Sequence, residues 1–277
     1  MDVVCVGDCG VDHYLPSGER WVGGITANFA RHARREFRQD DDIRIVSCVG
    51  NDDAARQVRS ALAGSGIDCH ISEYPGATPV QYIEIEADGE KNFVRYDEGV
   101  LRDFRFSDEQ VALIAAADLV VAPVYLQIAG LFDTLMSINT RGTIAIDFAD
   151  FLQYPDFDLL DRHLRAVDIG FFGLSVADEA IISELQMRAA RHDKLLVVTL
   201  GPDGSRAFVG RSTMECPAEP VDRVVDTTGA GDAYAAGFLS RWCRGAPVGE
   251  AMRHGAAVAA SVVGRLGSDG QGLFRGG

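Results

Sequence analysis

A glycine-rich turn in the last quarter of the chain carries the strongest chemical pattern in the sequence. It runs from Asp226 to Asp232, reads Asp-Thr-Thr-Gly-Ala-Gly-Asp, and is followed by small and apolar residues suited to a helix. Helix N-termini present unpaired N–H groups and the positive end of the helix dipole. Gly229 and Gly231 leave the backbone bare, so an anion can lie against consecutive N–H groups. The turn therefore predicts an anion-binding site.

Asp232 adds a second chemical group at the same place. It falls in the first turn of the predicted helix, where its charge is favourable and its carboxylate points toward the anion site. A carboxylate beside an anion site suits phosphoryl transfer, because one group deprotonates or positions a hydroxyl while the other stabilises the transferred charge. The alternative is an ordinary Asp helix cap after a glycine turn. The full seven-residue run and the small-residue helix after it favour the site.

This run resembles the C-terminal signature of the ribokinase-like (PfkB) carbohydrate kinases, in its D-T-x-G-A-G-D form. The resemblance implies that Asp232 is the catalytic base, that Gly229, Ala230 and Gly231 form the anion cradle, and that Thr228 contributes to cofactor binding. It also implies ATP and Mg²⁺ as cofactors and leaves a monovalent cation open. A site rich in Asp near ATP needs Mg²⁺ to offset charge repulsion.

An N-terminal segment resembles the first motif of the same family. It comprises Gly7-Asp8, then Asp12, then Gly23-Gly24 followed by Asn28. In that family the early Asp, the glycine pair and the Asn bind sugar hydroxyls, so the resemblance implies that Asp12, Gly23, Gly24 and Asn28 bind substrate. Carboxylate and amide groups hydrogen-bond hydroxyls, and glycines permit close backbone approach. Asp8 can equally be a strand-end residue, and we do not assign it to the site.

Residues 199–204, Thr-Leu-Gly-Pro-Asp-Gly, match the T-x-G-x-x-G pattern that lies beside ATP in this family. The match implies that Thr199, Gly201 and Gly204 bind the cofactor. A Pro-Asp-Gly hairpin turn fits the same residues, and both interpretations can hold together.

The family also carries an N-x-x-E segment near the magnesium-bound phosphates, and here the chain departs from it. The Glu is Glu179, to which the resemblance gives an indirect metal role, whereas the Asn position holds Val176, or Ser175 with a one-residue offset. The effect of the missing Asn stays open, as does a simple helix-start role for Glu179. Asp147, at a predicted strand end, either faces the phosphates or caps the strand.

Within the family, the chain is most similar to the fructoselysine (fructosamine) 6-kinase group. The similar stretches are residues 7–12, 96–100 and 147–150. The resemblance places Arg95 and Glu98 beside the substrate, where a charged pair suits the zwitterionic amino-acid half of a fructosamine. An exposed strand pair of little energetic value is the alternative, and the two interpretations stay open.

Composition narrows the class of protein. The 277 residues include 26 Lys and Arg and 41 Asp and Glu, for a net charge of −15, which disfavours nucleic acids and anionic membranes as partners. No uncharged stretch reaches the ~18 apolar residues of a membrane span. The start of the chain lacks a signal-peptide pattern. Six cysteines without metal-ligand spacing indicate reduced thiols, so we expect a cytoplasmic protein; the reactivity of Cys9 stays open.

Alternating apolar and mixed segments predict the elements that position these residues. Short apolar runs bounded by Gly, Asp or Pro indicate buried strands at 3–6, 44–49, 119–122, 143–146, 168–172 and 195–199. Helices are predicted at 27–37, 53–63, from the Ser107–Gln110 capping box, at 177–191, 232–243 and 250–263. This alternation predicts an α/β fold with a mostly parallel sheet and helices on both faces, a three-layer α/β/α fold. The resemblance makes it ribokinase-like.

Two segments break the alternation and predict a lid. Residues 12–24 are short and glycine-punctuated, and residues 79–97 form a hairpin pattern around Asp88-Gly89. We expect them to pair as a small antiparallel flap, inserted within one kinase domain of residues 1–277, over the carboxyl ends of the strands where ligands bind. A homodimer through the lid is left open, because its acidic residues can blunt strand pairing.

Together these observations predict an ATP-dependent phosphotransferase that phosphorylates a hydroxyl of a sugar or sugar-amine adduct, with a fructoselysine-type 6-kinase favoured. The alternatives are a kinase of ribose, fructose or a nucleoside, and a non-catalytic descendant of the fold that binds a sugar or nucleotide. The chain has neither the P-loop pattern nor the protein-kinase motifs. We expect a small-molecule sugar and ATP as partners, with no nucleic acid and no membrane.

Overall fold

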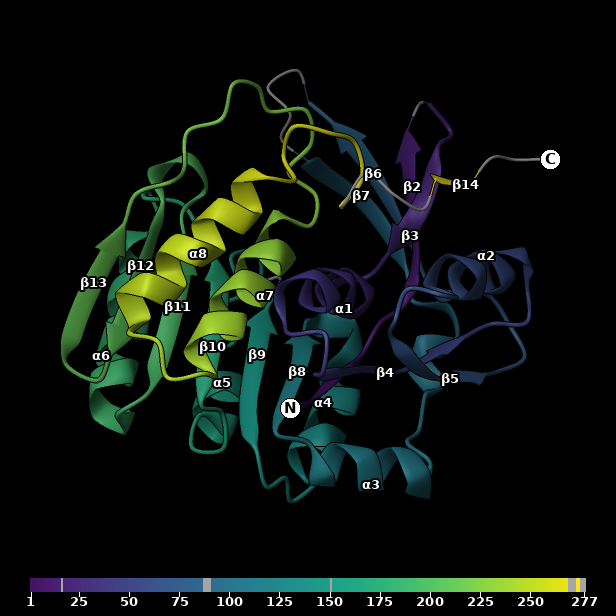
Figure 1. Ribbon diagram of the computed structural model, residues 1–277, viewed down its shortest axis with the longest axis horizontal. Helices are drawn as coiled ribbons and strands as arrows, with labels where there is room; N and C mark the ends of the chain where they lie inside the picture. Colours follow the sequence, from purple (N-terminus) through teal and green to yellow (C-terminus); the bar gives the residue numbers. More distant parts are fainter. Residues whose placement is uncertain (16, 87–90, 150, 269–272, 275–277) are drawn as a thin grey trace.

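A nine-stranded sheet forms the middle layer of the computed structural model, which describes residues 1–15, 17–86, 91–149, 151–268 and 273–274 (Figure 1). The strand order is β13-β12-β11-β10-β9-β8-β1-β4-β5. The strands are β1 (Asp2–Val6), β4 (Asp42–Val49), β5 (Asp68–Glu73), β8 (Leu119–Val124), β9 (Thr143–Phe148), β10 (Ile169–Gly173), β11 (Leu195–Thr199), β12 (Ser205–Val209) and β13 (Ser212–Cys216). The seven strands from β11 to β5 run parallel, whereas β12 and β13 form an antiparallel edge.

Helices cover both faces of this sheet. On one face lie α1 (Ile25–Glu36), α2 (Asp53–Leu62), α7 (Ala230–Trp242) and α8 (Val248–Ala260). On the other lie α3 (Asp108–Ala116), α4 (Ala129–Met136), α5 (Phe157–His163) and α6 (Glu179–His192). Three short 3-10 helices connect elements at Gly99–Asp103, Leu126–Ile128 and Gly201–Asp203. The predicted three-layer α/β/α arrangement is confirmed.

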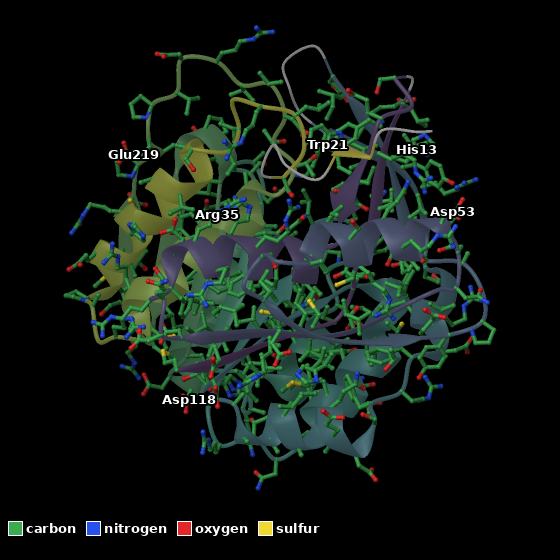
Figure 2. The ribbon with its side chains drawn as sticks, turned by 45° about the vertical axis from the view of Figure 1, so that its right-hand side comes forward. His13, Trp21, Arg35, Asp53, Asp118 and Glu219 are labelled. Carbon is green, nitrogen blue, oxygen red and sulfur yellow. The ribbon has the colours of Figure 1, made fainter. Side chains whose placement is uncertain are left out.

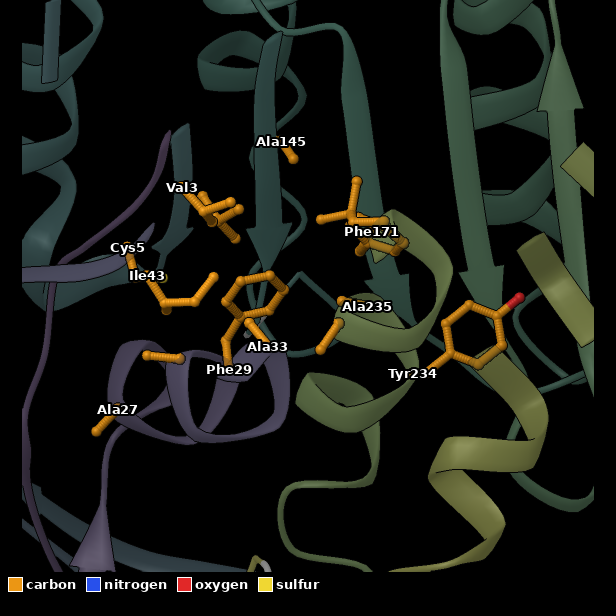
Figure 3. Packing of buried hydrophobic residues seen from close by; sticks show 14 of the residues in the cluster. Val3, Cys5, Ala27, Phe29, Ala33, Ile43, Ala145, Phe171, Tyr234 and Ala235 are labelled. Carbon is orange, nitrogen blue, oxygen red and sulfur yellow. The ribbon is translucent and has the colours of Figure 1, made fainter. Parts of the chain in front are cut away.

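Strand residues alternate between the two cores, as a sheet covered on both faces requires. In β1, Val3 and Cys5 join the core under α1 and α7, while Val4 and Val6 join the core under the opposite helices. Figure 3 shows how Phe29 of α1 and Phe171 of β10 fill the space between helices and sheet on the first face.

The chain reverses its direction of travel across the sheet at β1. From β1 it builds outward through β4 and β5, then returns to β8 on the other side and continues through β9 to β11. In open α/β sheets such a switch point opens a crevice at the carboxyl ends of the flanking strands. Asp8 follows β1 and Tyr125 follows β8, so these residues border that crevice.

A second sheet, hereafter the small sheet, projects from this edge. Its strands are β2 (Gly10–Leu15), β3 (Arg20–Gly23), β6 (Val80–Ile85), β7 (Lys91–Asp97) and β14 (Leu273–Phe274), in the order β14-β3-β2-β6-β7. Three of its four pairings are antiparallel, as expected, but β2 and β6 run parallel. The parallel pairing follows from connectivity, because a long crossover separates the two strands. The predicted turn at Asp88-Gly89 lies outside the described residues.

Figure 2 shows His13 and Trp21 on the small sheet, and Asp118, which precedes β8, at the opposite end of the molecule. The amino-terminal edge of the main sheet therefore lies far from the small sheet. The predicted site residues belong to the edge that the small sheet adjoins.

Candidate active site

The turn before α7 is shaped by a glycine in the left-handed region. Gly229 is the N-cap of α7, with φ 78° and ψ 0°. A Cβ atom added to Gly229 would lie 2.4 Å from the Cβ of Ser268, which is far inside van der Waals contact. Both the positive φ and the close approach therefore require glycine at this position.

The N–H groups of this turn differ in what they contact. The Ala230 N–H donates to the Thr227 carbonyl at 3.2 Å, so it is already engaged. Within the described part of the chain, the N–H groups of Gly229 and Gly231 donate to no other backbone group. A Cβ atom added to Gly231 would enter open space. The structure thus leaves room for an anion at Gly231, at the positive end of α7.

The buried carboxylate of Asp226 ties the turn to its surroundings. Asp226 accepts hydrogen bonds from the Thr228 N–H at 2.8 Å, the Gly267 N–H at 2.9 Å and the Tyr14 hydroxyl at 2.7 Å. Tyr14 belongs to β2, so the small sheet contacts the turn directly. Asp226 therefore holds Thr228 and the anion cradle in position. Asp226 belongs to the motif identified in the sequence, but the sequence pattern assigned it no role.

Asp232 lies buried in the first turn of α7, with 7% of its surface exposed. Burial, followed by the nearby charges of Asp147 and Asp8, raises the pKa of Asp232 well above its ordinary value. Hydrogen bonding by Asn28 and the charge of Lys91 oppose that rise in pKa. A carboxylate with a raised pKa in a crevice suits a general base that works near neutral pH.

Three further carboxylates surround the same crevice. Burial and the charges of Asp8 and Asp226 raise the pKa of Asp12 to about 7. Burial and the charge of Asp8 raise the pKa of Asp147 to about 7. Burial also raises the pKa of Asp8. Mutual repulsion among four carboxyl groups opposes folding, so their gathering indicates a site that binds a cationic or hydrogen-bonding ligand.

Asp8, which we left out on sequence grounds, positions the helix that carries the predicted sugar-binding residues. Its two oxygens accept hydrogen bonds at 3.1 Å from the N–H groups of Ile25 and Thr26, the first residues of α1. Gly24, the N-cap of α1, has no side chain to do this. A Cβ atom at Gly24 would lie 2.8 Å from the Asp8 carbonyl oxygen, so the backbone there approaches closely.

The predicted substrate residues Asp12, Gly23 and Asn28 lie together. A Cβ atom at Gly23 would lie 2.1 Å from a carboxylate oxygen of Asp12, so only glycine lets this carboxylate lie against the backbone. Asn28 is buried in α1 and accepts a hydrogen bond from the Ser268 hydroxyl at 2.7 Å. The Asn28 side chain also lowers the pKa of Asp232, so the structure brings a predicted sugar-binding residue close to the predicted catalytic residue.

The predicted nucleotide residues occupy the carboxyl end of β11. Thr199 ends that strand and its hydroxyl donates to the Phe172 carbonyl at 3.4 Å. Gly201 has φ 57° and open space beside its Cα, as a residue facing a ligand would. Gly204 instead packs against the strand β13 backbone: a Cβ atom added to it would lie 2.2 Å from the Cys216 carbonyl oxygen. Glycine at this position is therefore required by the hairpin turn. The hydroxyl groups of Tyr234 on α7 and Ser205 on β12 are hydrogen-bonded at 2.9 Å, which holds α7 beside this edge of the sheet.

Glu179 begins α6 and forms an ion pair with Arg206 at 3.1 Å. Val176, at the position of the missing Asn, is exposed, and the Ser175 hydroxyl donates to Asp178 at 2.9 Å. Among the described residues, no three acidic, His or Cys side chains gather in a metal-binding group.

The structure does not bring Arg95 to the other predicted substrate residues. Arg95 pairs with Asp97 at 2.9 Å and stacks on the Tyr82 ring, 4.1 Å from its centre. Tyr82 in turn stacks on His13, whereas the next residues along β2, Asp12 and Tyr14, face the crevice. Because strand residues alternate between faces, Arg95 stands on the face of the small sheet that points away from Asp232.

Glu98 also has its own partner. It forms an ion pair with Arg102, one turn later in the chain, rather than with Arg95. The predicted Arg95–Glu98 pair is therefore absent. The β-bulge at Tyr82/Ile83 accounts for the side of Arg95, because it reverses the face on which the β7 residues after Phe93 project.

Sequence reasoning missed the residues that connect the small sheet to the crevice. The hydroxyls of Tyr96 on β7 and Tyr125 after β8 lie 3.0 Å apart. Lys91 Nζ donates to the Thr227 carbonyl at 3.2 Å. No motif or spacing distinguished these side chains, because their roles arise only when β7 folds over α7. Cys9 is buried with its thiol pKa raised well above its ordinary value, so it is an inert core residue.

Among the described residues, no helix combines the length and apolar character needed to cross a bilayer.

The chain matches the model of a protein family described as "pfkB family carbohydrate kinase" over residues 1–146 and 171–271. It is 33% identical over 260 residues to the fructoselysine 6-kinase of Shigella flexneri, spanning 93% of this chain and 95% of that protein. The fructosamine kinase FrlD of Bacillus subtilis (strain 168) is 28% identical over 277 residues, spanning 98% and 94%. The structure of Arabidopsis thaliana ribokinase complexed with ribose and ATP matches with a TM-score of 0.79 and 20% identity, over 96% and 93% of the two chains.

Proposed function

Since the chain belongs to the pfkB family of carbohydrate kinases and is a sugar kinase, we propose that it transfers the γ-phosphoryl group of ATP to the 6-hydroxyl of a fructosamine of the fructoselysine type. The observation that carries the proposal is the position of Asp232. Its buried carboxylate lies in the first turn of α7, close to Asn28, and follows the open space at Gly231 by one residue.

In this mechanism Asp232 acts as the general base. The sugar hydroxyl donates its proton to the Asp232 carboxylate while its oxygen attacks the γ-phosphorus, and the bond from that phosphorus to the bridging oxygen of ADP breaks. The N–H groups of Gly229 and Gly231, with the dipole of α7, stabilise the negative charge on the transferred group. Asp12 and Asn28 hold the sugar by hydrogen bonds.

The nucleotide lies along the carboxyl end of β11 in this proposal, against Thr199, Gly201 and Thr228. Mg²⁺ supplies charge neutralisation on the phosphates when bound. Glu179 is the residue that we assign to its hydrated shell, which its exposed position at the start of α6 allows. Gly204 shapes the hairpin that supports this edge rather than contacting the nucleotide.

The small sheet serves as the lid in this proposal, within one kinase domain. Its contacts with Asp226, Thr227 and Tyr125 let it cover the crevice and exclude water, which protects ATP from hydrolysis. Dimerisation through its exposed edge strand β7 stays a prediction.

Two observations support a fructosamine over a plain sugar. The fructoselysine 6-kinase of Shigella flexneri and the fructosamine kinase of Bacillus subtilis align with nearly all of the chain. A fructosamine also carries a secondary amine that is protonated at neutral pH. Burial raises the pKa of Asp8, Asp12 and Asp147, so a cation beside these carboxyl groups would stabilise their ionised forms, which an uncharged sugar does not do.

A substrate panel tests the proposal. Sugar-dependent ADP release would be measured with MgATP and fructoselysine, fructose, ribose, adenosine or cytidine, and the product would be identified by phosphorus NMR. We expect kcat/KM for fructoselysine at least tenfold above that for the other compounds, with phosphate on the 6-oxygen. A higher kcat/KM for fructose, ribose or a nucleoside would keep the kinase and overturn the fructosamine assignment. Phosphate on another oxygen would overturn the assigned position.

A further inference from the structure

The segment that follows α8 returns to the crevice and packs against the turn before α7. The Gly267 N–H donates to the Asp226 carboxylate at 2.9 Å. The Cβ atom of the next residue, Ser268, lies against Gly229, 2.4 Å from where a Cβ atom of that residue would stand. Residues 267 and 268 are therefore fixed to the turn that carries the anion cradle.

Ser268 also contacts a second element, through its hydroxyl. That hydroxyl donates to Oδ1 of Asn28 on α1 at 2.7 Å, across 240 residues of the chain. Ser268 has 2% of its surface exposed and Asn28 has 4%, so water has little access to either group. One side chain thus links the cradle turn to the helix that carries a predicted sugar-binding residue.

This contact determines which end of the Asn28 amide faces the crevice. A side-chain amide has an oxygen that accepts hydrogen bonds and an NH₂ group that donates them. Because Oδ1 of Asn28 points toward Ser268, its NH₂ group points away from Ser268. The lowering of the Asp232 pKa by Asn28 agrees with this orientation, since an amide N–H stabilises a carboxylate whereas an amide oxygen repels it.

We propose that Ser268 is a positioning residue for phosphoryl transfer: its hydroxyl holds Oδ1 of Asn28, so that the NH₂ group of Asn28 is directed toward Asp232 and donates to the sugar oxygen bound there. This proposal rests on the proposed function, in which Asp232 is the base and Asn28 binds the sugar.

The arrangement suits an alcohol as the substrate. An NH₂ group carries two N–H bonds, so one stabilises the Asp232 carboxylate while the other donates to a sugar oxygen. Reversal of the amide would take Oδ1 away from the Ser268 hydroxyl and would bring two acceptors, the amide oxygen and the carboxylate, together. Ser268 therefore helps to keep a donor, rather than an acceptor, directed at the sugar.

A double-mutant cycle tests this role. Ser268→Ala should lower kcat/KM for the sugar by about tenfold, the order of one buried hydrogen bond, and change KM for ATP by less than about twofold. In the Asn28→Ala background the same substitution should change kcat/KM by less than about twofold, because the group that Ser268 positions is gone. Independent losses that simply multiply in the double variant would overturn the proposal.

A second measurement completes the cycle for variants that turn over too slowly to assay. Calorimetry would give the Kd of the sugar and of ATP for each folded variant. We expect Ser268→Ala to weaken sugar binding severalfold in the wild-type background but not in the Asn28→Ala background. An equal loss of affinity for the sugar and for ATP would contradict a role through Asn28.

Ser240→Ala is the matched control. Ser240 is also buried, and its hydroxyl donates to the Gly237 carbonyl at 2.8 Å within α7. We expect its kcat and both KM values within about twofold of wild type. A sugar-specific loss as large as that of Ser268→Ala would overturn the proposal, because any buried hydroxyl would then have the same effect. Turnover by the wild type decides the proposed function separately, since the cycle compares variants with one another for the same sugar.

Discussion

At the scale of single residues, the two glycines that flank Ala230 have different roles. Gly229 is required by the backbone, because its φ is 78° and a side chain would collide with Ser268. Gly231 faces open space and has no such backbone requirement. The same pattern of Gly-Ala-Gly therefore contains one position for folding and one for the ligand.

This difference gives a pair of matched substitutions. Gly229→Ala should lower the free energy of unfolding by at least ~1–2 kcal/mol, because alanine is disfavoured in the left-handed region and its Cβ would clash with Ser268. Gly231→Ala should leave the melting temperature nearly unchanged but reduce kcat/KM by about tenfold or more, because its methyl group enters the anion site. Thermal unfolding and steady-state kinetics measure the two effects. A Gly231→Ala enzyme with wild-type kinetics would place the transferred group elsewhere.

The position of a single residue could be predicted from sequence where the residue belongs to a motif with a defined place in the fold. Asp12, Asn28 and Asp232 fall in such motifs; Asn28 lowers the pKa of Asp232, and the charge of Asp8 raises the pKa of both Asp12 and Asp232. No motif fixes the position of Arg95, and the β-bulge in the β6–β7 pair places its side chain on the outer face of the small sheet. Lys91 gave no sequence signal, because its role depends on a contact across 136 residues.

At the scale of elements, α1 begins without a capping side chain of its own. Asp8, sixteen residues earlier than Gly24, supplies the missing acceptor from the end of β1. A charge at this position also interacts favourably with the dipole of α1. The end of a central strand thus fixes the helix that carries Asn28.

Substitution of Asp8 tests this link. Asp8→Ala should lower the free energy of unfolding by about 1–3 kcal/mol, because two N–H groups lose their buried acceptor. It should also raise KM for the sugar more than KM for ATP, since Asn28 moves with α1. Asp8→Asn, which retains one acceptor oxygen, should have smaller effects on both quantities. Equal changes in the two KM values would argue against a local effect through α1.

Element prediction succeeded where short apolar runs were bounded by turn residues. It failed at a polar edge strand and at a long apolar run that contains several elements. The buried parallel strands and the Ser107–Gln110 capping box are present as expected. Strand β5 was missed because it lies at the sheet edge and reads Asp-Cys-His-Ile-Ser-Glu, with a single buried apolar residue. Helix α4 was missed because the stretch around Pro123 reads as one apolar run, whereas it folds as a strand, a 3-10 turn and a helix.

At the scale of the whole molecule, the crevice combines the charge of several distant elements in one place. Asp8 follows β1 and Asp147 lies in β9 of the main sheet, Asp12 lies in the small sheet, and Asp232 lies in α7. A fold optimised for stability alone would not gather them. The sequence predicted the acidic character of the chain, but only the topology shows where the charges meet.

This gathering predicts a pH-dependent stability. The pKa of Asp147 is about 7 in the folded protein, above its ordinary value of 3.8, so the folded state binds the proton more tightly than the unfolded state does. The stability that this group contributes is present below about pH 4 and is lost as pH rises through about 7. Asp147→Asn should therefore raise the melting temperature of the ligand-free protein at pH 8, by roughly 5 °C, and change it little at pH 4. A gain of equal size at both pH values would contradict the account.

The most direct test of the account is sugar-dependent ADP release by Asp232→Asn, measured beside calorimetric binding of ATP and of the best sugar from the panel. Because Asn cannot accept the proton of the hydroxyl but is close to Asp in size, we expect kcat to fall by about 10²–10⁴-fold while both ligands still bind. Turnover of Asp232→Asn within a few-fold of wild type, with binding intact, would show that Asp232 is not the base and would contradict the central claim.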